Sequence, residues 1–430
     1  MKSIMIQPFS LNGKVKIPPS KSLCHRAIIA SALSKGESVI HNINMSEDIT
    51  ATCELMEKLG AKIKKLPSSL HISGKGVLEL ITKKNEYNVL QCNESGSTLR
   101  FLIPIAMQTG VEIIFKGRGK LVHRPLKAYY EIFDKQNIKY TTDNGGLPLI
   151  IDGRLSPGIF ELRGDISSQF ITGLLYALPL LNGDSTIVVT TKMESIGYID
   201  LTLDILSKFG VTIENNNYKE FKVKGNQHYE KRDYRVEGDF SQAAFYLAAG
   251  VLGGEVQCDD LNMESLQGDR VIVDIIKNMG GKISQVDGII KASKSDLKGC
   301  VIDVSQCPDL LPIAAVLGAL SEGTTEIINA ARVRIKESDR LKAIATELNK
   351  IGAEVIERED SLLIHGKLSL RGGVVNSWND HRIAMAMAIA SIRCTEKLTI
   401  QDSGAIKKSY PEFYEDFKSL GGKINERTMG

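Results

Sequence analysis

Acidic and hydroxyl side chains recur at equivalent positions of this chain, at the expected starts of four amphipathic helices. These positions hold Ser46-Glu47-Asp48, Glu194-Ser195, Glu264-Ser265 and the segment Lys336–Arg340. Ser and Asp at a helix start commonly accept hydrogen bonds from free backbone N–H groups, so capping alone accounts for most of them. If the helices of a domain start at one place, however, their positive dipole ends also meet there. The pattern then predicts a cleft that binds anions.

Two basic clusters strengthen the prediction of an anion site. The first lies between Lys21 and Arg26, and the second runs from Arg332 to Arg340. Where the second cluster becomes helical, Lys336 and Arg340 form a like-charged i,i+4 pair, which costs roughly a few tenths of a kcal/mol unless an anion lies between them. Lys supplies a point charge and Arg a forked contact, as phosphate and carboxylate recognition requires. A solvated run of charges is the alternative interpretation.

Six copies of one pattern supply the elements that must hold these residues. In each copy an apolar helix and a Gly-centred break precede a strand, and an amphipathic helix follows. Each amphipathic helix is expected to end at a residue in the left-handed conformation. The expected end residues are Gly60, Asn137, Gly210, Gly280, Gly352 and Gly421. Their spacing of about 70 residues is too long for the common solenoids and predicts six small α/β units.

The length of the chain predicts two domains. Its 430 residues exceed what one hydrophobic core usually serves, and three repeats per domain is the natural division. One boundary is expected in the polar segment Asn226–Arg235, and a second crossing at Pro18-Pro19, which hold the chain extended. The expected domains are therefore residues 1–18 with 236–430, and the inserted residues 19–235.

Composition narrows the class of protein. The net charge of +3 is too small to indicate a nucleic-acid-binding surface. The first ten residues lack a signal-peptide core, and the longest charge-free run, residues 166–183, contains polar residues and a Pro that a membrane helix would carry only at a cost. Seven cysteines without a C-x-x-C pair favour reduced, packed thiols over disulfides or zinc. We therefore expect a soluble, cytoplasmic protein without a structural metal.

Nine short motifs occur in chain order. They are P-S-K-S-x-x-x-R (19–26), S-G-S-T-x-R (95–100), H-R-P (123–125), S-S-Q-F (167–170), S-I-G-Y-I-D (195–200), V-E-G-D (236–239), K-E-S-D-R (336–340), N-D-H-R (379–382) and K-S-Y-P (408–411). Together they resemble the 3-phosphoshikimate 1-carboxyvinyltransferase (5-enolpyruvylshikimate-3-phosphate synthase) family of enolpyruvyl transferases. The resemblance spans nearly the whole chain.

This resemblance implies a fold and a reaction. The family fold is α/β, with two inside-out, barrel-like α/β domains of three βαβαββ-type repeats each and an active-site cleft between them. The first strand and the chain end complete one discontinuous domain around the inserted one. The implied reaction transfers the enolpyruvyl group of phosphoenolpyruvate to the 5-hydroxyl of shikimate 3-phosphate, on the route to chorismate and the aromatic amino acids. Addition and elimination through a tetrahedral intermediate release phosphate.

The resemblance also implies what accompanies the reaction. The two small-molecule substrates are the expected partners, without nucleic acid or membrane, and neither cofactor nor metal is needed. The family expectation is a monomer. Glyphosate is the family's inhibitor at the phosphoenolpyruvate site, and the chain is expected to be sensitive to it.

Site residues are implied position by position. Those for shikimate 3-phosphate are Lys21, Ser22, Arg26, Ser167, Ser168, Gln169, Ser195, Tyr198, Asp309 and Lys336. Those for phosphoenolpyruvate are Lys21, Gly96, Arg124, Gln169, Arg340, Arg382 and Lys408, with Asp380 and His381 as additional candidates. The implied catalytic residues are Lys21, Asp309, which takes the 5-hydroxyl proton, and Glu337, which delivers a proton to the methylene carbon and later removes it.

These residue types suit that chemistry. Addition to an enol ether needs a proton donor at carbon and a base at the attacking hydroxyl, which two carboxylates supply if their environments differ. An intermediate that carries phosphate and carboxylate needs several cations. Simpler explanations exist: Glu337 could pair with Arg340 alone, Asp309 could cap a helix, and His381 could be a core residue. Gly96 could serve backbone conformation only.

Two positions depart from the family pattern, and no role is assigned there. Glu94 stands where many members carry Asn, with Asn93 one residue earlier, and Arg332 stands where an Asn is often seen. Arg332 could add to the anion site or face solvent.

Two other functions compete. UDP-N-acetylglucosamine enolpyruvyl transferases share the fold and the donor, but they carry a reactive Cys on a loop of the second repeat, and residues 117–125 contain none. The S-S-Q and N-D-H-R motifs also favour the shikimate enzyme. The other candidate is a non-catalytic protein that binds nucleic-acid ends through related repeats. The weak net charge and the carboxylate pair Asp309 and Glu337 argue against it.

Overall fold

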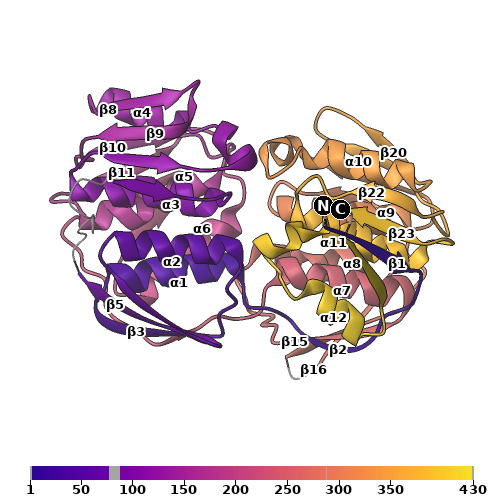
Figure 1. Cartoon of the computed structure of the whole chain (residues 1–430). Helices are drawn as coiled ribbons and strands as arrows, with labels where there is room; N and C mark the ends of the chain where they lie inside the picture. Colours follow the sequence, from indigo (N-terminus) through magenta and orange to yellow (C-terminus); the bar gives the residue numbers. More distant parts are fainter. Residues whose placement is uncertain (1, 77–87, 287, 429–430) are drawn as a thin grey trace. The chain divides into compact units, whose positions relative to one another are not determined.

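The computed structural model describes residues 2–76, 88–286 and 288–428. The chain divides into two compact units: unit 1 is Met1–Ser20 with Glu237–Gly430, and unit 2 is Lys21–Val236. Each unit has its own hydrophobic core, built from its own residues (Figure 1). The chain passes between the units twice, after Ser20 and after Val236.

The strands of the described residues form six four-stranded sheets of one design. In every sheet a parallel pair is continued by two antiparallel pairings. The strands of unit 2 are β3 (Lys35–His41), β4 (Lys62–Leu66), β5 (Ser69–Lys75), β6 (Val89–Gln91), β7 (Ile113–Lys116), β8 (Lys139–Asp143), β9 (Gly146–Asp152), β10 (Ile159–Leu162), β11 (Ser185–Val189), β12 (Ile213–Asn216), β13 (Glu220–Val223) and β14 (Tyr234–Arg235). Those of unit 1 are β1 (Lys2–Gln7), β2 (Asn12–Lys16), β15 (Glu255–Asp259), β16 (Lys282–Val286), β17 (Ile289–Ser293), β18 (Val301–Asp303), β19 (Thr324–Ile328), β20 (Glu354–Glu357), β21 (Leu362–His365), β22 (Gly373–Asn376), β23 (Leu398–Gln401) and β24 (Lys423–Thr428). The shared design confirms the six repeats predicted from the sequence.

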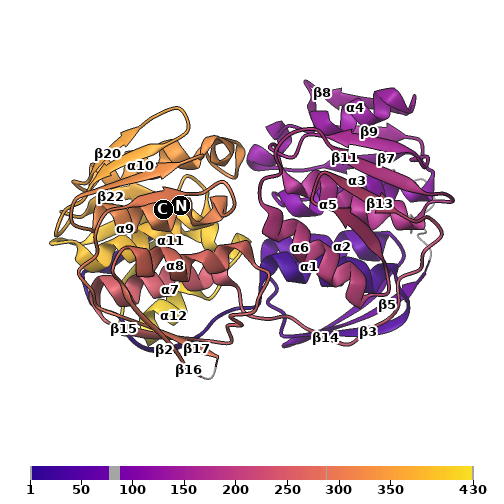
Figure 2. The same cartoon turned by 180° about the vertical axis from the view of Figure 1, so that it is seen from behind.

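Three apolar helices lie inside each unit, and the strands lie around them (Figures 1 and 2). They are α1 (Lys21–Leu33), α3 (Gly96–Ala106) and α5 (Ser168–Ala177) in unit 2, and α7 (Phe240–Gly253), α9 (Leu311–Ala319) and α11 (His381–Ala390) in unit 1. All six are buried over nearly their whole length, which explains why apolar residues predominate in them and are not confined to one face. The inside-out α/β fold expected from the resemblance is therefore confirmed.

The second helix of each repeat is amphipathic and ends where the sequence predicted. These helices are α2 (Glu47–Lys58), α4 (Lys127–Lys135), α6 (Ile196–Lys208), α8 (Ile272–Asn278), α10 (Arg340–Lys350) and α12 (Phe413–Ser419). All six predicted end residues have positive φ, from 54° at Asn137 to 105° at Gly60. A left-handed residue cannot continue a right-handed helix, so these six positions end the second helix of each repeat.

Unit 1 joins the two ends of the chain in one sheet. Strand β1 lies between β23 and β24 and pairs antiparallel with both, with Ile4 opposite Ile400 on one side and Glu426 on the other. The N and C labels of Figure 1 accordingly lie side by side. Among the described residues, no helix combines the length and the apolar character needed to cross a membrane. The cysteines are free thiols, and all but Cys300 are buried.

Candidate active site

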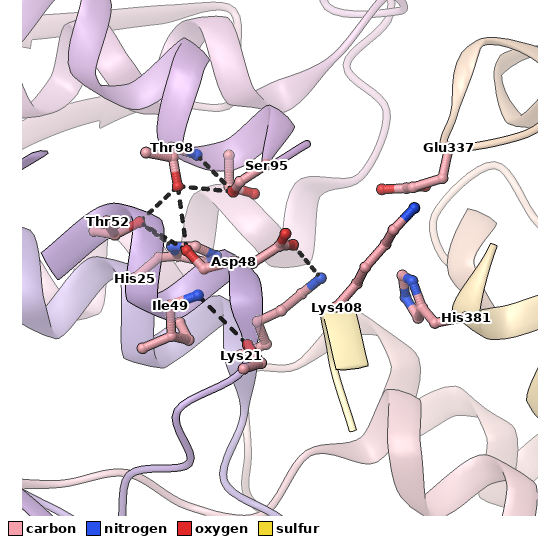
Figure 3. A network of polar contacts seen from close by, with 12 residues as sticks. Lys21, His25, Asp48, Ile49, Thr52, Ser95, Thr98, Glu337, His381 and Lys408 are labelled. Carbon is pink, nitrogen blue, oxygen red and sulfur yellow. Dashed lines mark hydrogen bonds and ion pairs between the residues drawn. The ribbon is translucent and has the colours of Figure 1, made fainter. Parts of the chain in front are cut away.

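In unit 2, hydrogen bonds join the first turns of α1, α2 and α3 (Figure 3). The Lys21 ammonium lies 2.8 Å from Asp48 Oδ2, at the start of α2. Thr98, in the first turn of α3, donates to Ser95 Oγ at 2.7 Å and to the Asp48 carbonyl at 3.4 Å. The helix starts therefore meet, as the anion-site prediction required, and Lys21 is placed among their positive ends.

His25 belongs to the same group but carries no charge. Its Nδ1 lies 2.7 Å from Thr52 Oγ1. Burial, together with the nearby charges of Lys21 and Arg26, holds the pKa of His25 well below its ordinary value. A neutral imidazole with this partner holds α1 against α2 and supplies no proton.

Arg26 contacts several of the residues predicted to bind shikimate 3-phosphate. It is buried, and its guanidinium donates to Thr202 Oγ1 at 2.9 Å, to the Ser22 carbonyl at 2.8 Å and to the Tyr198 carbonyl at 2.9 Å. The guanidinium also lies over the Phe101 ring, 5.2 Å from its centroid. Burial lowers the pKa of Arg26 to about 10, so it stays cationic at neutral pH. Thr202 was not predicted as part of this group.

Arg100 links two further groups, and the sequence analysis gave it no role although it ends the S-G-S-T-x-R motif. It donates to Gln169 Oε1 at 2.7 Å and to the Pro125 carbonyl at 3.3 Å. Gln169 in turn donates to Ser97 Oγ at 2.9 Å. This chain of contacts fixes the Gln169 amide and the backbone beside Arg124.

Gly96 and Arg124 lie directly against each other. A Cβ on Gly96 would stand 2.5 Å from Arg124 Nη1, so the guanidinium occupies the space that a side chain would need. Gly96 is the first residue of α3, and its φ is not among the positive ones. The close approach of Arg124, and not turn geometry, therefore distinguishes this glycine, and a Cβ here would displace the end of the Arg124 side chain.

Two serines of the candidate group begin helices in different ways. Ser167 caps α5, with Ser168 as the first helical residue, and its Oγ accepts from the Gln169 N–H at 3.4 Å. Ser195 precedes α6 in a left-handed conformation with φ 56° and makes no cap hydrogen bond. Helix capping therefore does not explain Ser195, and such backbone strain is common at ligand sites.

In unit 1 the centre of the candidate group is Arg340, the first residue of α10. Its side chain is 1% exposed and contacts Asp380 at 2.8 Å, Asp309 at 2.8 Å and Glu337 at 2.6 Å. Burial opposes its charge, but Asp380, Glu337 and Asp309 outweigh burial and raise the pKa of the guanidinium. Burial would likewise raise the pKa of Asp380, but the charges of Arg340 and His381 outweigh burial and lower it. Arg340 therefore binds three carboxylates at once.

Asp309 contacts three cations of this group. It lies in the short helix η5 (Pro308–Leu310) and contacts Arg340 at 2.8 Å, Arg382 at 2.9 Å and Lys336 at 3.4 Å. The predicted i,i+4 helical pair of Lys336 and Arg340 is wrong, because Lys336 has extended backbone before α10 begins. The carboxylate of Asp309 bridges the two cations instead.

The start of α11 holds the remaining candidates. Asp380 caps this helix by accepting from the Arg382 N–H at 2.9 Å, and buried His381 is its first residue. Lys408, in the short helix η8 (Ser403–Lys408), donates to the Asn379 carbonyl at 2.6 Å. Figure 3 includes the side chains of Glu337, His381 and Lys408.

Arg332, to which no role was assigned, lies in the short helix η6 (Ala331–Ile335). Its guanidinium donates to the Ser305 carbonyl at 2.6 Å and is partly buried. It therefore does not simply extend into solvent.

A buried carboxylate, Asp269, was missed by the sequence analysis. It is 3% exposed in η4 (Gly268–Val271) and accepts a hydrogen bond from Ser241, in the first turn of α7. Burial first, and then the charge of Asp309, raise the pKa of Asp269 to about 7. Neither Asp269 nor Ser241 stands in a charged cluster of the sequence, so only the tertiary fold identifies them.

The variant Asp269→Asn should change how stability depends on pH. The folded protein retains the Asp269 proton up to about pH 7, whereas the unfolded chain releases it near pH 4, so this group's stabilisation is lost as pH rises between them. Asn mimics the protonated acid at all pH values. We therefore expect the Tm of the variant, relative to wild type, to be higher at pH 8 than at pH 5. The exposed Asp274→Asn is the control, and a Tm difference independent of pH would contradict the raised pKa.

Taken together, each unit offers a distinct chemical surface. Unit 2 offers Lys21, Arg26 and Arg124 with hydroxyl and amide groups at helix starts, which suits a phosphorylated polyol or a small anion. Unit 1 offers two carboxylates, Asp309 and Glu337, held by cations, which suits proton transfer beside anionic groups.

Comparisons with known proteins agree with this chemistry. The sequence model of the EPSP synthase (3-phosphoshikimate 1-carboxyvinyltransferase) family matches residues 6–417. A 3-phosphoshikimate 1-carboxyvinyltransferase of Clostridium novyi (strain NT) is 58% identical over 434 aligned residues, and one of Clostridium kluyveri is 57% identical over 430; each alignment covers 100% of both chains. A solved structure of EPSP synthase from Acinetobacter baumannii has the same fold, with a TM-score of 0.83 at 24% identity over 100% of both chains.

Proposed function

The chain belongs to the EPSP synthase family, and from that premise we propose how its residues carry out the family's reaction. It is a transferase that moves the carboxyvinyl group of phosphoenolpyruvate to the 5-hydroxyl of shikimate 3-phosphate and releases phosphate. We propose that units 1 and 2 are the discontinuous and the inserted enolpyruvyl transferase domains. We also propose that it acts as a cytoplasmic monomer.

The acceptor is assigned to residues of both units. In unit 2 these are Lys21, Ser22, Arg26, Ser167, Ser168, Gln169, Ser195 and Tyr198, and in unit 1 Asp309 and Lys336. The contacts of Arg26 with the Ser22 and Tyr198 backbone support this group as one ligand surface. The Lys21 ammonium, which contacts Asp48, would be shared with phosphoenolpyruvate.

The donor is assigned to cations that can hold its phosphate and carboxylate: Lys21, Arg124, Arg340, Arg382 and Lys408, with Gly96 and Gln169 beside them and with Asp380 and His381 as supports. Their positive charge favours a tetrahedral intermediate that carries both anionic groups. Gly96 leaves room for the Arg124 guanidinium, as its contact distance requires.

Proton transfer is assigned to two carboxylates. Asp309 takes the proton of the attacking 5-hydroxyl while Glu337 protonates the methylene carbon of phosphoenolpyruvate. In the elimination Glu337 removes a proton from that carbon, and phosphate leaves with the proton that Asp309 accepted, so both carboxylates return to their starting states. The observation that carries the proposal is that both carboxylates contact one buried guanidinium, that of Arg340, and that Asp309 also contacts Arg382 and Lys336. Different neighbours give the two acids the different environments that acid and base roles need.

An acceptor assay tests the proposed function. Phosphate release from phosphoenolpyruvate should require shikimate 3-phosphate and should not occur with UDP-N-acetylglucosamine. Residues 117–125 contain no Cys, as expected for a shikimate enzyme. Release with the nucleotide sugar alone would overturn the proposal.

The variant Gly96→Ala should separate inhibitor binding from substrate binding. Its Cβ would lie 2.5 Å from Arg124 Nη1, so the guanidinium must shift and the shape of the proposed donor site must change. Glyphosate is longer than phosphoenolpyruvate, so its affinity should fall more when the space in the site is reduced. We expect the wild type to be sensitive and the variant's glyphosate inhibition constant to rise much more than its KM for phosphoenolpyruvate.

The matched control is Gly404→Ala, because a Cβ there meets nothing within 4 Å. Equal changes in both constants for Gly96→Ala would mean that this glycine positions Arg124 without discriminating between the ligands.

A further inference from the structure

The turn that precedes α11 is strained. Trp378 and Asn379 have φ of 57° and 53°, two consecutive left-handed residues of which neither is glycine. Asn tolerates this conformation, but for a bulky residue such as Trp it is a real outlier. Backbone strain of this kind persists only where the surrounding structure imposes it, and it is common at functional sites.

The carboxylate of Glu347 imposes the conformation of this turn. Glu347 lies on α10 with 0% exposure. One carboxylate oxygen accepts from Trp378 Nε1 at 2.6 Å, and the other accepts from the Asn376 N–H at 2.9 Å. The half-exposed Lys350 is its cationic partner, at 2.8 Å. A fully buried carboxylate is costly to retain, and here both of its oxygens bind the two ends of one turn.

This turn also positions the cations assigned to phosphoenolpyruvate. The Asn379 carbonyl accepts from Lys408 Nζ at 2.6 Å. The next residue, Asp380, binds the Arg340 guanidinium at 2.8 Å and the Arg382 N–H at 2.9 Å. Helix α10 therefore holds this turn at two places, through Arg340 at its first residue and through Glu347 two turns later.

We infer that Glu347 and Trp378 are positioning residues for phosphoenolpyruvate: the bond from the indole to the carboxylate fixes the turn from which Lys408, Arg340 and Arg382 are aligned. The inference rests on the proposed function, which assigns these three cations to the donor. Neither Glu347 nor Trp378 needs to touch a substrate.

A role in packing alone would have different consequences. Trp378 packs against the core of unit 1, so its loss could lower stability without any effect on ligands. A positioning role instead affects phosphoenolpyruvate much more than shikimate 3-phosphate, because most acceptor residues belong to unit 2, whereas the turn and the three donor cations belong to unit 1. The ratio of the two KM values therefore separates the two roles.

The test uses the full-length enzyme and the variants Glu347→Gln and Trp378→Phe. Glu347→Gln removes the negative charge of the acceptor and so weakens the indole bond, whereas Trp378→Phe removes the indole N–H and keeps an aromatic ring. We expect each to raise the KM for phosphoenolpyruvate about tenfold and to leave the KM for shikimate 3-phosphate within about twofold. The double variant should be no worse than the worse single variant, because both substitutions act on the same bond. The control is Glu354→Gln at an exposed position of β20, and we expect both of its KM values to equal those of the wild type.

A spectroscopic measurement provides an independent result. Trp378 is the chain's single tryptophan, so its emission should change when phosphoenolpyruvate is added to wild type with shikimate 3-phosphate present. The titration midpoint should move about tenfold in Glu347→Gln. Equal rises in both KM values, or a lower Tm with unchanged KM values, would overturn the inference. A wild type that binds no phosphoenolpyruvate would overturn the proposed function as well, so the two failures are distinguishable.

Discussion

Replacing Glu337 by Gln is expected to lower kcat by a factor of about 10² to 10⁴ while leaving the affinity for shikimate 3-phosphate nearly unchanged. In the wild type Arg340 Nη2 lies 2.6 Å from the Glu337 carboxylate. The amide oxygen of Gln can still accept this hydrogen bond, so the local structure should persist. What the amide cannot do is carry a proton to and from the methylene carbon. Steady-state kinetics and calorimetric titration of shikimate 3-phosphate measure the two quantities.

The control for this variant is Glu354→Gln, an equal chemical change at an exposed position of unit 1. If Glu337→Gln retains near-native turnover, Glu337 is not the proton donor and only anchors Arg340.

The variant Arg340→Met is expected to destabilise unit 1 by about 3–5 kcal/mol and to abolish activity. Removing the guanidinium leaves Asp309, Glu337 and Asp380 without their common cation, in a region where Arg340 and Asp380 are almost completely buried. Urea unfolding followed by the emission of Trp378 measures the effect, because the single tryptophan lies in unit 1.

This destabilisation should depend on pH. The lowered pKa of Asp380 in wild type means that its pairing stabilises the fold above the unfolded pKa, near 4, and that this stabilisation is lost as pH falls through the folded pKa. Without Arg340, burial would instead raise the pKa of Asp380, so the variant buries an unpaired charge at pH 7 and a protonated acid at lower pH, and its deficit should be larger at pH 7 than at pH 4. The control is Arg358→Met, because Arg358 pairs with Glu326 at the surface with a half-exposed side chain and should contribute less than about 1 kcal/mol. Equal effects of both variants would contradict the buried-cation argument.

The repeats could be predicted from the sequence because their signals are local. A left-handed residue such as Gly352 or Asn137 ends a helix through its own backbone conformation, whatever surrounds it. Apolar periodicity likewise separates the inner helices from the outer ones. Strands from distant parts of the chain were harder to place, since the sheet partner of β14 or β2 depends on contacts that no local pattern records.

The candidate residues could be identified from their motifs, but their partners could not. The sequence places Lys336 and Arg340 four residues apart and suggests a helical pair, whereas the structure brings Asp309 between them from a distant segment. Asp269 and Glu347 were missed for the same reason, because a buried carboxylate is recognised only by the groups that surround it. Arg100 was present in a quoted motif, and its role became clear only from its contact with Gln169.

The position of β1 between β23 and β24 has a consequence for biosynthesis. Unit 2 is one continuous stretch of chain, so it can fold on the ribosome as soon as its last strand has emerged. Strand β1 is made before unit 2 but must wait for β24, with which it pairs from Lys2 opposite Thr428 to Gln7 opposite Lys423. A strand that precedes unit 2 in the chain is thus among the last to be paired, and a ribosome that stops before residue 423 releases a folded unit 2 joined to an unfinished sheet.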